Sequence, residues 1–376
     1  MIYFDHAATS YPKPKSILPI LEDALVRAGG NPGRSGHRLS LLASEGIYGV
    51  RELLCDFFEG EAPESFVFTE NATHAINLAI KTAIRPQMHV LISDLEHNAV
   101  FRPIYRLYRD GVISFSIFKT KGNVLDNIAS ACNEKTGMLI CTHISNVNGQ
   151  RLPIKKIAAL CRQRRIYCIV DASQGAGHLP LSFRDVDADA FCAPAHKGLQ
   201  GIQGAGFVYL KSKDGLCEFM EGGSGSHSLN PHMPDELPER YEAGTLPTPA
   251  IFALGAGIRH LQAIGGAEKM ELHERALCHR ALEMLSAIPG VSVFAASPES
   301  GLLSFNLPYR TSEEVAYLLD KEGVCVRGGF HCAPLAHRTL GTGEYGAVRI
   351  SFGPENTESE LEEFYRIIKR LNTIRK

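Results

Sequence analysis

The 376-residue sequence has no large charge excess of either sign, no long apolar run, no low-complexity tract and no internal repeat. Its 39 basic and 41 acidic residues give a net charge of -2, which excludes a general electrostatic field for nucleic acid or anionic membranes. No stretch approaches the ~20 apolar residues that a membrane-spanning helix needs. Met1–His6 has neither the basic start nor the apolar run of a signal peptide, so we expect a cytoplasmic protein.

The sequence also lacks the cysteine pattern of a disulfide-stabilised protein. Its ten cysteines are scattered through a long chain, and several, such as Cys141 and Cys168, lie in apolar runs typical of strands. Free thiols in a reducing compartment explain this distribution best. A zinc site of His331, Cys332 and His337 is disfavoured, because no second pair of ligands occurs at the spacings that zinc sites use. We therefore expect no metal.

The spacing of apolar runs indicates the fold class. A chain of this length, 44% hydrophobic and 21% charged, should form two globular domains of unequal size. From about residue 65 to 210, short apolar runs alternate with segments of helical length. This predicts an α/β fold whose mostly parallel sheet is covered on both faces and binds ligands at the carboxyl ends of its strands. The expected strands contain Phe66–Phe68, Val90–Ile92, Met138–Cys141, Tyr167–Val170, Ala190–Cys192 and Gly206–Leu210.

The pattern changes after residue 210. A glycine- and proline-rich stretch, Gly222–Pro249, is too long for a simple connection, and such segments usually carry function or a subunit contact. A helical segment at Ala250–Ile288 and a strand at Gly301–Asn306 predict a smaller α+β domain. Thr357 and Glu360 form a capping box for a final amphipathic helix. The apolar stripe of this helix consists of Leu361, Phe364, Ile368 and Leu371.

Asp171 follows the apolar run Tyr167–Val170, where an unpaired carboxylate would be costly to bury. The segment Asp171–Gln174 resembles a strand-to-helix junction in which the aspartate caps a helix, and position alone favours this interpretation. Alternatively, the carboxylate meets a cation at the strand end, and a pyridinium nitrogen is one such partner.

Lys197, preceded by His196, lies between an apolar run and the glycine-rich segment Gly198–Gly206. A lysine in such a loop is most often a solvated charge or a phosphate contact. However, the segment lacks the Gly-Lys-Ser/Thr order of a P-loop, and its glycines do not have the dinucleotide-binding spacing. Nucleotide binding is therefore disfavoured, and a lysine that forms a Schiff base gains support.

Cys332 lies in a Gly-Gly-Phe-His-Cys-Ala-Pro turn, with Arg327 and His331 nearby in the sequence. A thiol beside cationic groups loses its proton below the usual pKa of ~8.5 and becomes a nucleophile. The alternatives are the zinc site considered above and an inert buried cysteine, which is the commonest state of this residue.

Several segments occur together in an order known from one enzyme family. Over nearly its whole length the chain resembles the pyridoxal-phosphate enzymes of aminotransferase class V, in the branch of cysteine desulfurases and selenocysteine lyases. Any one segment is weak evidence, but nine in the right order are specific and favour the catalytic interpretations of Asp171, Lys197 and Cys332. The segments are Tyr3–Thr9, Asn31–Pro32, Phe68–Asn77, Glu96–His97, Ser145–Asn146, Val170–Gln174, His196–Lys197, Glu242–Thr245 and the loop that begins at the turn around Cys332 and ends in Arg349–Ser351.

The resemblance implies fold type I of the pyridoxal-phosphate enzymes, similar to aspartate aminotransferase. A large domain at residues 15–248 would hold a mainly parallel seven-stranded sheet, and residues 1–14 and 249–376 would form a small α+β domain. A homodimer is also implied, because Thr245 would reach the cofactor phosphate of the neighbouring subunit.

The resemblance further assigns cofactor contacts. Lys197 would hold pyridoxal 5'-phosphate as an imine and then act as the base that moves the substrate's α-proton. Asp171 would keep the pyridinium nitrogen protonated, so that the ring accepts electron density. The other implied contacts are ring stacking by His97, hydrogen bonds to the phenolic oxygen by Asn146 and Gln174, and phosphate binding by Ala72, Thr73 and His196.

For the substrate, the resemblance implies that Arg349, with Asn146, binds the carboxylate of L-cysteine through a two-pronged ion pair. Cys332 would attack the substrate sulfur, leaving a persulfide for an acceptor protein and releasing L-alanine. Pro194 departs from the family, which often has a serine or threonine there on the phosphate. The same residues also suit a selenocysteine lyase, whereas a class V aminotransferase or epimerase would not need Cys332. A decayed sulfur-carrier or assembly protein is the alternative from another functional class.

Overall fold

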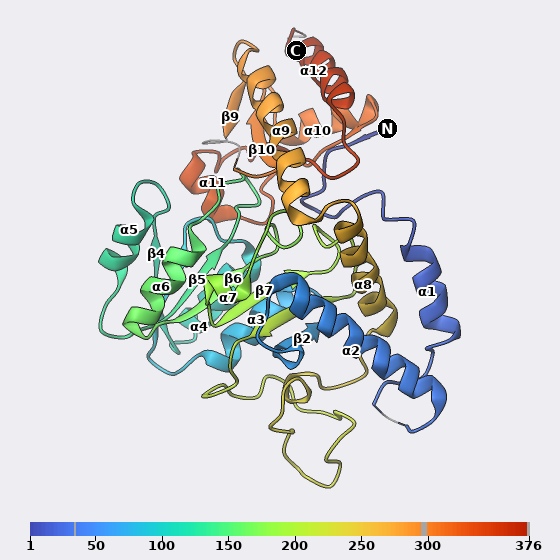
Figure 1. The fold of residues 1–376 in the computed structure, drawn as a ribbon. Helices are drawn as coiled ribbons and strands as arrows, with labels where there is room; N and C mark the ends of the chain where they lie inside the picture. Colours follow the sequence, from blue (N-terminus) through green and yellow to red (C-terminus); the bar gives the residue numbers. More distant parts are fainter. Residues whose placement is uncertain (34, 295–298, 374–376) are drawn as a thin grey trace.

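The computed structural model describes residues 1–33, 35–294 and 299–373. Its central strands are β2 (Phe66–Thr69), β3 (His89–Ser93), β4 (Ser114–Phe118), β5 (Thr136–Thr142), β6 (Tyr167–Asp171), β7 (Ala190–Pro194) and β8 (Gly206–Leu210). They form one seven-stranded sheet in the order β2-β8-β7-β6-β5-β3-β4 (Figure 1). Neighbouring strands from β4 to β7 are parallel, whereas β8 is antiparallel to both β7 and β2. The predicted mainly parallel sheet of seven strands is confirmed.

Helices cover both faces of this sheet, because its strands are apolar on both sides. The helices of this part are α1 (Ile17–Val26), α2 (Arg38–Phe58), α3 (Ala72–Ala83), α4 (Asn98–Arg109), α5 (Val124–Ala131), α6 (Ile154–Arg164), α7 (Phe183–Val186) and α8 (Thr248–Ala263). Successive residues of β5 point to opposite faces, as the period of a strand requires. Leu139 and Cys141 share a core with residues of α2, α6 and α8, whereas Met138 and Ile140 share another with α3 and α4.

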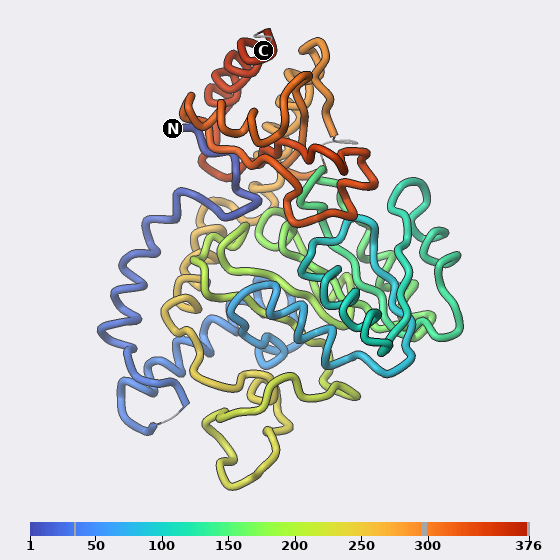
Figure 2. The backbone as a smooth tube through the Cα atoms, turned by 180° about the vertical axis from the view of Figure 1, so that it is seen from behind, coloured from blue at the N-terminus to red at the C-terminus, as the bar shows by residue number. Residues whose placement is uncertain are grey.

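Both ends of the described chain lie in a smaller part of the molecule, at the top of Figures 1 and 2. Its elements are β1 (Ile2–Tyr3), α9 (Gly266–Ser286), β9 (Ser292–Phe294), β10 (Leu302–Asn306), α10 (Ser312–Lys321), β11 (Val324–Cys325), α11 (Pro334–Leu340), β12 (Val348–Ser351) and α12 (Glu358–Thr373). Strands β12, β10 and β9 form an antiparallel sheet, and β1 pairs in parallel with β11. The predicted capping box and apolar stripe of α12 are both present.

Two features refine the expected organisation of the chain. The helical segment after residue 250 is two helices, because Gly265 and Gly266, with φ of 111° and 77°, break it between α8 and α9. Apolar residues of α8 pack into the core of the large sheet. The division into domains at residues 14 and 248 remains a prediction.

The stretch at residues 211–247 is irregular apart from a short 3-10 turn at Glu239–Tyr241, and it projects from the end of the molecule opposite α12 (Figure 1). All ten cysteines are free thiols. In the described part of the chain, no helix is long and apolar enough to cross a membrane. Nor does this part contain a group of three or more potential ligands that could hold a metal ion.

Candidate active site

Four neighbouring parallel strands end at the same edge of the sheet and carry most of the predicted residues to one place. β6 ends at Asp171, and the turn after β7 carries His196 and Lys197. β5 is followed by Asn146, and β3 is followed by His97. Since ligands of α/β sheets bind at the carboxyl ends of the strands, the topology alone gathers these side chains where a ligand is expected.

These side chains line a cavity of about 200 Å³. Every cofactor-binding residue predicted from the sequence lies in its wall except Thr245, and Pro194 lies there as well. The lining residues are Asn71, Ala72, Thr73, Ile76, His97, Ala99, Thr142, Asn146, Asp171, Ser173, Gln174, Pro194, His196 and Lys197.

Lys197 supplies an amine that is easy to deprotonate. Burial lowers its pKa to about 8; Asp171 opposes this effect, whereas the guanidinium groups of Arg349 and Arg327 add to it. An amine with this pKa is unprotonated in about a tenth of molecules at pH 7, far more than an ordinary lysine with a pKa of ~10.4. It can therefore act as a nucleophile towards a carbonyl group or as a base.

Asp171 supplies a buried carboxylate in the wall of the same cavity. The residue is 4% exposed, and its Oδ1 accepts a hydrogen bond from the backbone N–H of Ser173 at 2.9 Å. The chain turns after Asp171, and in this described stretch no α-helix begins before α7 at Phe183. The interpretation of Asp171 as a helix cap is therefore wrong, and its carboxylate is suited to a cation inside the cavity.

Two histidines in the wall are neutral. Burial, and next the charge of Lys197, lowers the pKa of His97 and of His196 to about 4. His97 is the N-cap of α4, and its Nδ1 accepts a hydrogen bond from the N–H of Ala99 at 3.0 Å. Nδ1 of His196 lies 3.1 Å from Oγ1 of Thr9. Neither ring therefore adds a positive charge beside the amine.

The start of α3 forms another side of the cavity. Asn71 is the N-cap of this helix, and its Oδ1 accepts a hydrogen bond from the N–H of His74 at 2.9 Å. The first N–H groups of a helix have no partner within it, and the helix dipole adds partial positive charge there. Because Ala72 and Thr73 also line the cavity, this helix end is suited to an anionic group such as phosphate.

The amides of Asn146 and Gln174 connect the cavity to distant parts of the chain. Nδ2 of Asn146 donates to the carbonyl of His331 at 2.8 Å, and Nε2 of Gln174 donates to the carbonyl of Ala7 at 2.9 Å. Each amide keeps a second N–H and an oxygen for a ligand. The wall of the cavity is thereby tied to both the cysteine turn and the N-terminal segment.

Arg349 is not among the residues that line the cavity, but it contacts the backbone of Asn146, which is. It is 1% exposed; its Nη1 donates to the carbonyl of Asn146 at 2.9 Å, and its Nη2 pairs with Oδ1 of Asp5 at 2.8 Å. Its Nε has no partner among the described residues. A buried guanidinium with an unused donor fits the predicted carboxylate site. However, Asp5 already binds Nη2, one of the two terminal nitrogens of the guanidinium.

Cys332 lines an adjoining cavity of about 400 Å³, which shares Thr73, His97 and Ala99 with the first cavity. Its thiol is exposed, and Sγ lies 3.8 Å from Nη2 of Arg327. The predicted nucleophile and the predicted amine therefore face neighbouring spaces with common walls. His331 and His337, which could have formed a zinc site with this thiol, instead contact each other through ring nitrogens 3.1 Å apart.

Thr245 does not reach the cavity of its own chain. It is exposed, and its Oγ1 accepts a hydrogen bond from Nδ2 of Asn31 at 3.4 Å. The segment before it is anchored by a buried ion pair between Glu242 and Arg51, and Oε1 of Glu242 also accepts from the N–H of Phe68 at 2.6 Å. The predicted contact of Thr245 with a second subunit remains a prediction.

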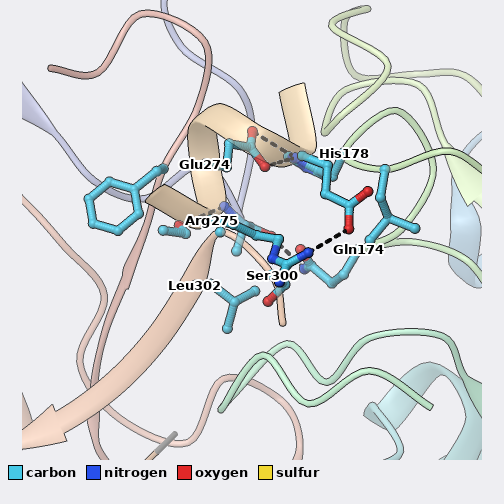
Figure 3. A pocket seen from close by; sticks show the side chains of 12 residues that line it. Gln174, His178, Glu274, Arg275, Ser300 and Leu302 are labelled. Atoms are coloured by element: carbon cyan, nitrogen blue, oxygen red, sulfur yellow. Dashed lines mark hydrogen bonds and ion pairs between the residues drawn. The ribbon is translucent and has the colours of Figure 1, made fainter. Parts of the chain in front are cut away.

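A smaller cavity shares Gln174 with the first one (Figure 3). Its wall includes His178 from the turn after β6 and Glu274 from α9, and Nδ1 of His178 lies 3.0 Å from both carboxylate oxygens of Glu274. This pair ties the large sheet to the smaller part of the molecule. The described residues of this wall include no lysine or cysteine, so we assign it a supporting role.

Sequence reasoning missed several polar residues around the candidate site. Asn71 had a usable signal, since an asparagine directly before a helix is a common cap. Asp5 and Thr9 lie in a segment that matched the family, but nothing in their spacing indicates their partners. Thr142 and Ser173 could be found only by their position next to a strand end.

Comparisons with known proteins agree with this geometry. The family model described as Aminotransferase class-V matches residues 2–364. A probable cysteine desulfurase of Methanothermobacter thermautotrophicus is 31% identical over 372 residues, which cover 96% of this chain and 92% of that protein. Another, from Halalkalibacterium halodurans, is 30% identical over 375 residues, with coverages of 96% and 91%.

The fold comparison gives the same result. The apo structure of a cysteine desulfurase from Thermococcus onnurineus NA1 matches with a TM-score of 0.89 at 28% sequence identity, covering 98% of this chain and 94% of that one. The family match spans nearly the whole chain and includes every residue of the cavity. This chain belongs to the class V aminotransferase family, in its cysteine desulfurase branch.

Proposed function

We propose that this chain is a cysteine desulfurase that uses pyridoxal 5'-phosphate to convert L-cysteine to L-alanine and collects the sulfur as a persulfide on Cys332. The observation that carries the proposal is the junction of two cavities. Lys197 lines one, Cys332 lines the other, and Thr73, His97 and Ala99 belong to both. An aminotransferase or epimerase would have no use for that thiol.

The residues of the cavity fit pyridoxal phosphate, on which class V enzymes generally depend. An aldehyde requires a nucleophilic amine, a pyridinium nitrogen requires a carboxylate, and a phosphate requires N–H donors. Lys197, Asp171 and the start of α3 supply these three features. Pro194 supplies no donor, so the phosphate would rely on the helix end and His196. When bound, the cofactor would withdraw electron density from the α-carbon of the substrate.

The chain's own residues would perform the remaining steps. Nζ of Lys197 would take and return the α-proton. Sγ of Cys332 would form a bond to the substrate sulfur while the substrate's Cβ–S bond breaks. The electron pair of that bond stays with the carbon fragment, which gains a proton and leaves as L-alanine. No external oxidant is required, and the sulfur remains as a persulfide on an exposed thiol that an acceptor protein could reach.

A product assay tests this function. With L-cysteine and a reductant, the loaded protein should release alanine and sulfide in equal amounts. Without an added reductant or acceptor, alanine formation should slow sharply after about one per active site, because the persulfide stays on Cys332 until the thiol of a further L-cysteine removes it. Absence of alanine from cofactor-loaded protein would contradict the proposal. The same assay with L-selenocysteine compares the two substrates, since both present the same carboxylate and amine.

Arg349→Lys should weaken substrate binding by about 1.5–3 kcal/mol, the scale of a hydrogen bond to a charged group. Lysine keeps the positive charge but loses the planar fork that binds a carboxylate at two points. We expect the KM for L-cysteine to rise and the cofactor absorbance to stay unchanged. Normal saturation by L-cysteine would place the carboxylate site elsewhere, with Arg327 as the next candidate.

We further propose an obligate homodimer in which Thr245 of each subunit completes the phosphate site of the other. Thr245 is exposed in its own chain, and the irregular segment before it projects from the molecule (Figure 1). If the cofactor binds only the assembled state, then cofactor binding and dimer formation must favour each other.

Thr245→Ala should weaken cofactor retention by about tenfold or more, the scale of one hydrogen bond to a charged phosphate. The measurement is the rate of cofactor loss on dilution, and removal of the cofactor should also lower the melting temperature. Thr373→Ala, which removes an exposed hydroxyl from the end of α12, is the matched control and should change neither. An active, loaded sample with a mass near the chain's own 41.1 kDa would refute the dimer.

A further inference from the structure

A row of three polar side chains lies next to Cys332 and plays no part in the chemistry described so far. His331, His337 and Thr342 are 2%, 0% and 6% exposed. Nε2 of His331 lies 3.1 Å from the carbonyl oxygen of Arg327, and Nδ1 of His331 lies 3.1 Å from Nε2 of His337. Nδ1 of His337 lies 2.7 Å from Oγ1 of Thr342. The three side chains thus form one continuous hydrogen-bonded row.

The chemistry of its first acceptor sets the direction of this row. A carbonyl oxygen only accepts, so Nε2 of His331 must carry a proton and donate to Arg327. A neutral His331 then accepts at Nδ1, which makes Nε2 of His337 the donor and leaves its Nδ1 as an acceptor. The hydroxyl of Thr342 lies 2.7 Å from this Nδ1 and 3.4 Å from the carbonyl oxygen of His337, so its one proton is assigned to the shorter contact. Burial supports neutral rings, because it lowers the pKa of His331 to about 2 and that of His337 to about 4. One arrangement of protons therefore satisfies every ring nitrogen.

The row supports a strained turn. His331 and Cys332 have φ of 50° and 54°, and two consecutive residues other than glycine in this left-handed region cost conformational energy. The conformation directs two backbone carbonyls to the candidate site. The carbonyl of His331 accepts from Asn146 at 2.8 Å, and that of Cys332 accepts from the N–H of Asn98, next to His97, at 2.7 Å.

The same row reaches the substrate side of the site. The carbonyl of Arg327 that receives the His331 proton also accepts from the backbone N–H of Arg349 at 2.8 Å. This one carbonyl therefore links the turn around Cys332 to β12, the strand that carries the proposed carboxylate-binding Arg349. Because β12 is also held by its pairing with β10, a shift in the histidine rings would move the turn and its thiol more than the strand that holds the guanidinium.

We propose that His337 and Thr342 are positioning residues for the nucleophile: through the ring of His331 they hold the turn in which the Cys332 thiol meets the substrate sulfur. This inference rests on the proposed function, since it assigns the turn a role in sulfur transfer. Neither residue lines the cavity of Lys197 or that of Cys332. Their effect passes through the backbone of the turn, so the step that involves the thiol should be more sensitive than substrate binding.

The test compares Thr342→Val, which keeps the shape but removes the hydroxyl, with Thr342→Ser, which restores it. In Thr342→Val, we expect the amides of residues 327–333 to exchange hydrogen about fivefold faster, the scale of one lost buried hydrogen bond. The kcat for alanine formation should fall by a similar factor with the KM for L-cysteine unchanged, and Thr342→Ser should recover both. Thr82→Val, which removes a 0% exposed hydroxyl at the far end of α3, should alter neither property of the turn.

A double mutant distinguishes the row from a general loss of stability. In the His337→Phe background the row is already cut, so Thr342→Val should add no further effect on kcat, whereas independent structural effects would add. Unchanged exchange and kcat in Thr342→Val, or equal defects in the valine and serine variants, would overturn the inference. If the wild type makes no alanine but Thr342→Val still speeds hydrogen exchange in the turn, the result would support the structural role of the row and refute the proposed function.

Discussion

Lys197→Ala should yield a folded protein without visible absorbance and with desulfuration reduced by at least about 10²–10⁴-fold. The covalent anchor of the cofactor and the base that moves the α-proton are lost in one substitution, and general acid-base catalysis alone accounts for a factor of that size. The fold should survive, because the change shortens a side chain that lines a cavity rather than one that fills a core. Absorbance, circular dichroism and alanine formation on the same sample measure all three expectations.

Lys13 is the matched control for this prediction. Burial lowers the pKa of Lys13 to about 8 as well, so pKa alone does not identify the anchor. The geometry identifies Lys197 as the anchor, because Lys13 is not among the residues that line the cavity. Nζ of Lys13 instead donates to Oγ of Ser10 at 2.7 Å and to the carbonyl of His196 at 3.0 Å. Lys13→Ala should keep the absorbance. Borohydride reduction followed by peptide mapping should label Lys197, and a label on Lys13 would overturn the assignment.

The pKa of Lys197 also predicts how pH affects loading of the cofactor-free protein. Only an unprotonated amine attacks an aldehyde, and burial brings the pKa of this amine down to about 8 from the usual ~10.4. The loading rate should therefore rise as the pH increases and level off above about 8. A rate that is still rising steeply near pH 10 would indicate a solvent-exposed lysine.

Cys332→Ser should retain the cofactor absorbance and the spectral change on adding L-cysteine, yet reduce alanine formation by about 10³-fold or more. Losses of this size are typical when an enzyme's nucleophile is removed. A hydroxyl does not form the sulfur–sulfur bond that the proposed reaction requires. Single-turnover measurements with mass spectrometry should find a persulfide on Cys332 in the wild type and none in the variant.

Cys217→Ser is the control for that experiment. Cys217 and Cys332 are the exposed cysteines among the ten free thiols, so both are open to reagents and to adventitious oxidation. Because Cys217 lies outside both cavities, its replacement should leave desulfuration intact. Desulfuration that continues unchanged in Cys332→Ser would favour a selenocysteine lyase, because release of selenium depends less on a cysteine nucleophile.

Local patterns in the sequence were enough to place the sheet and most of the cavity wall. Buried parallel strands appear as short apolar runs, and their carboxyl ends must meet at one edge, so residues after β3, β5, β6 and β7 could be expected to converge. β4 (Ser114–Phe118) was missed because its residues are partly exposed and include two serines, which weakens the apolar run. The break at Gly265 was missed because apolar residues continue on both sides of it.

Contacts between distant segments could not be derived in this way. Asp5 pairs with Arg349 only because β1 and β12 lie in the same part of the fold, and no periodicity in either segment indicates that pairing. The row from His331 to Thr342 depends on ring orientations that spacing alone does not determine. For Asp171, the local pattern favoured a helix cap, and the family resemblance together with the turn at Ser173 corrects it.

The pairing of β1 with β11 affects the order in which a newly synthesised chain can fold. Ile2 cannot pair with Val324, nor Asp5 with Arg349, until the chain through β12 has left the ribosome. The seven-stranded sheet is complete at Leu210 and can form earlier, because domains generally fold as units from the N-terminal side during translation. Closing the long loop to β11 then comes late and costs entropy. A nascent chain should thus acquire the cavity proposed to hold its cofactor well before the arginine proposed to hold its substrate.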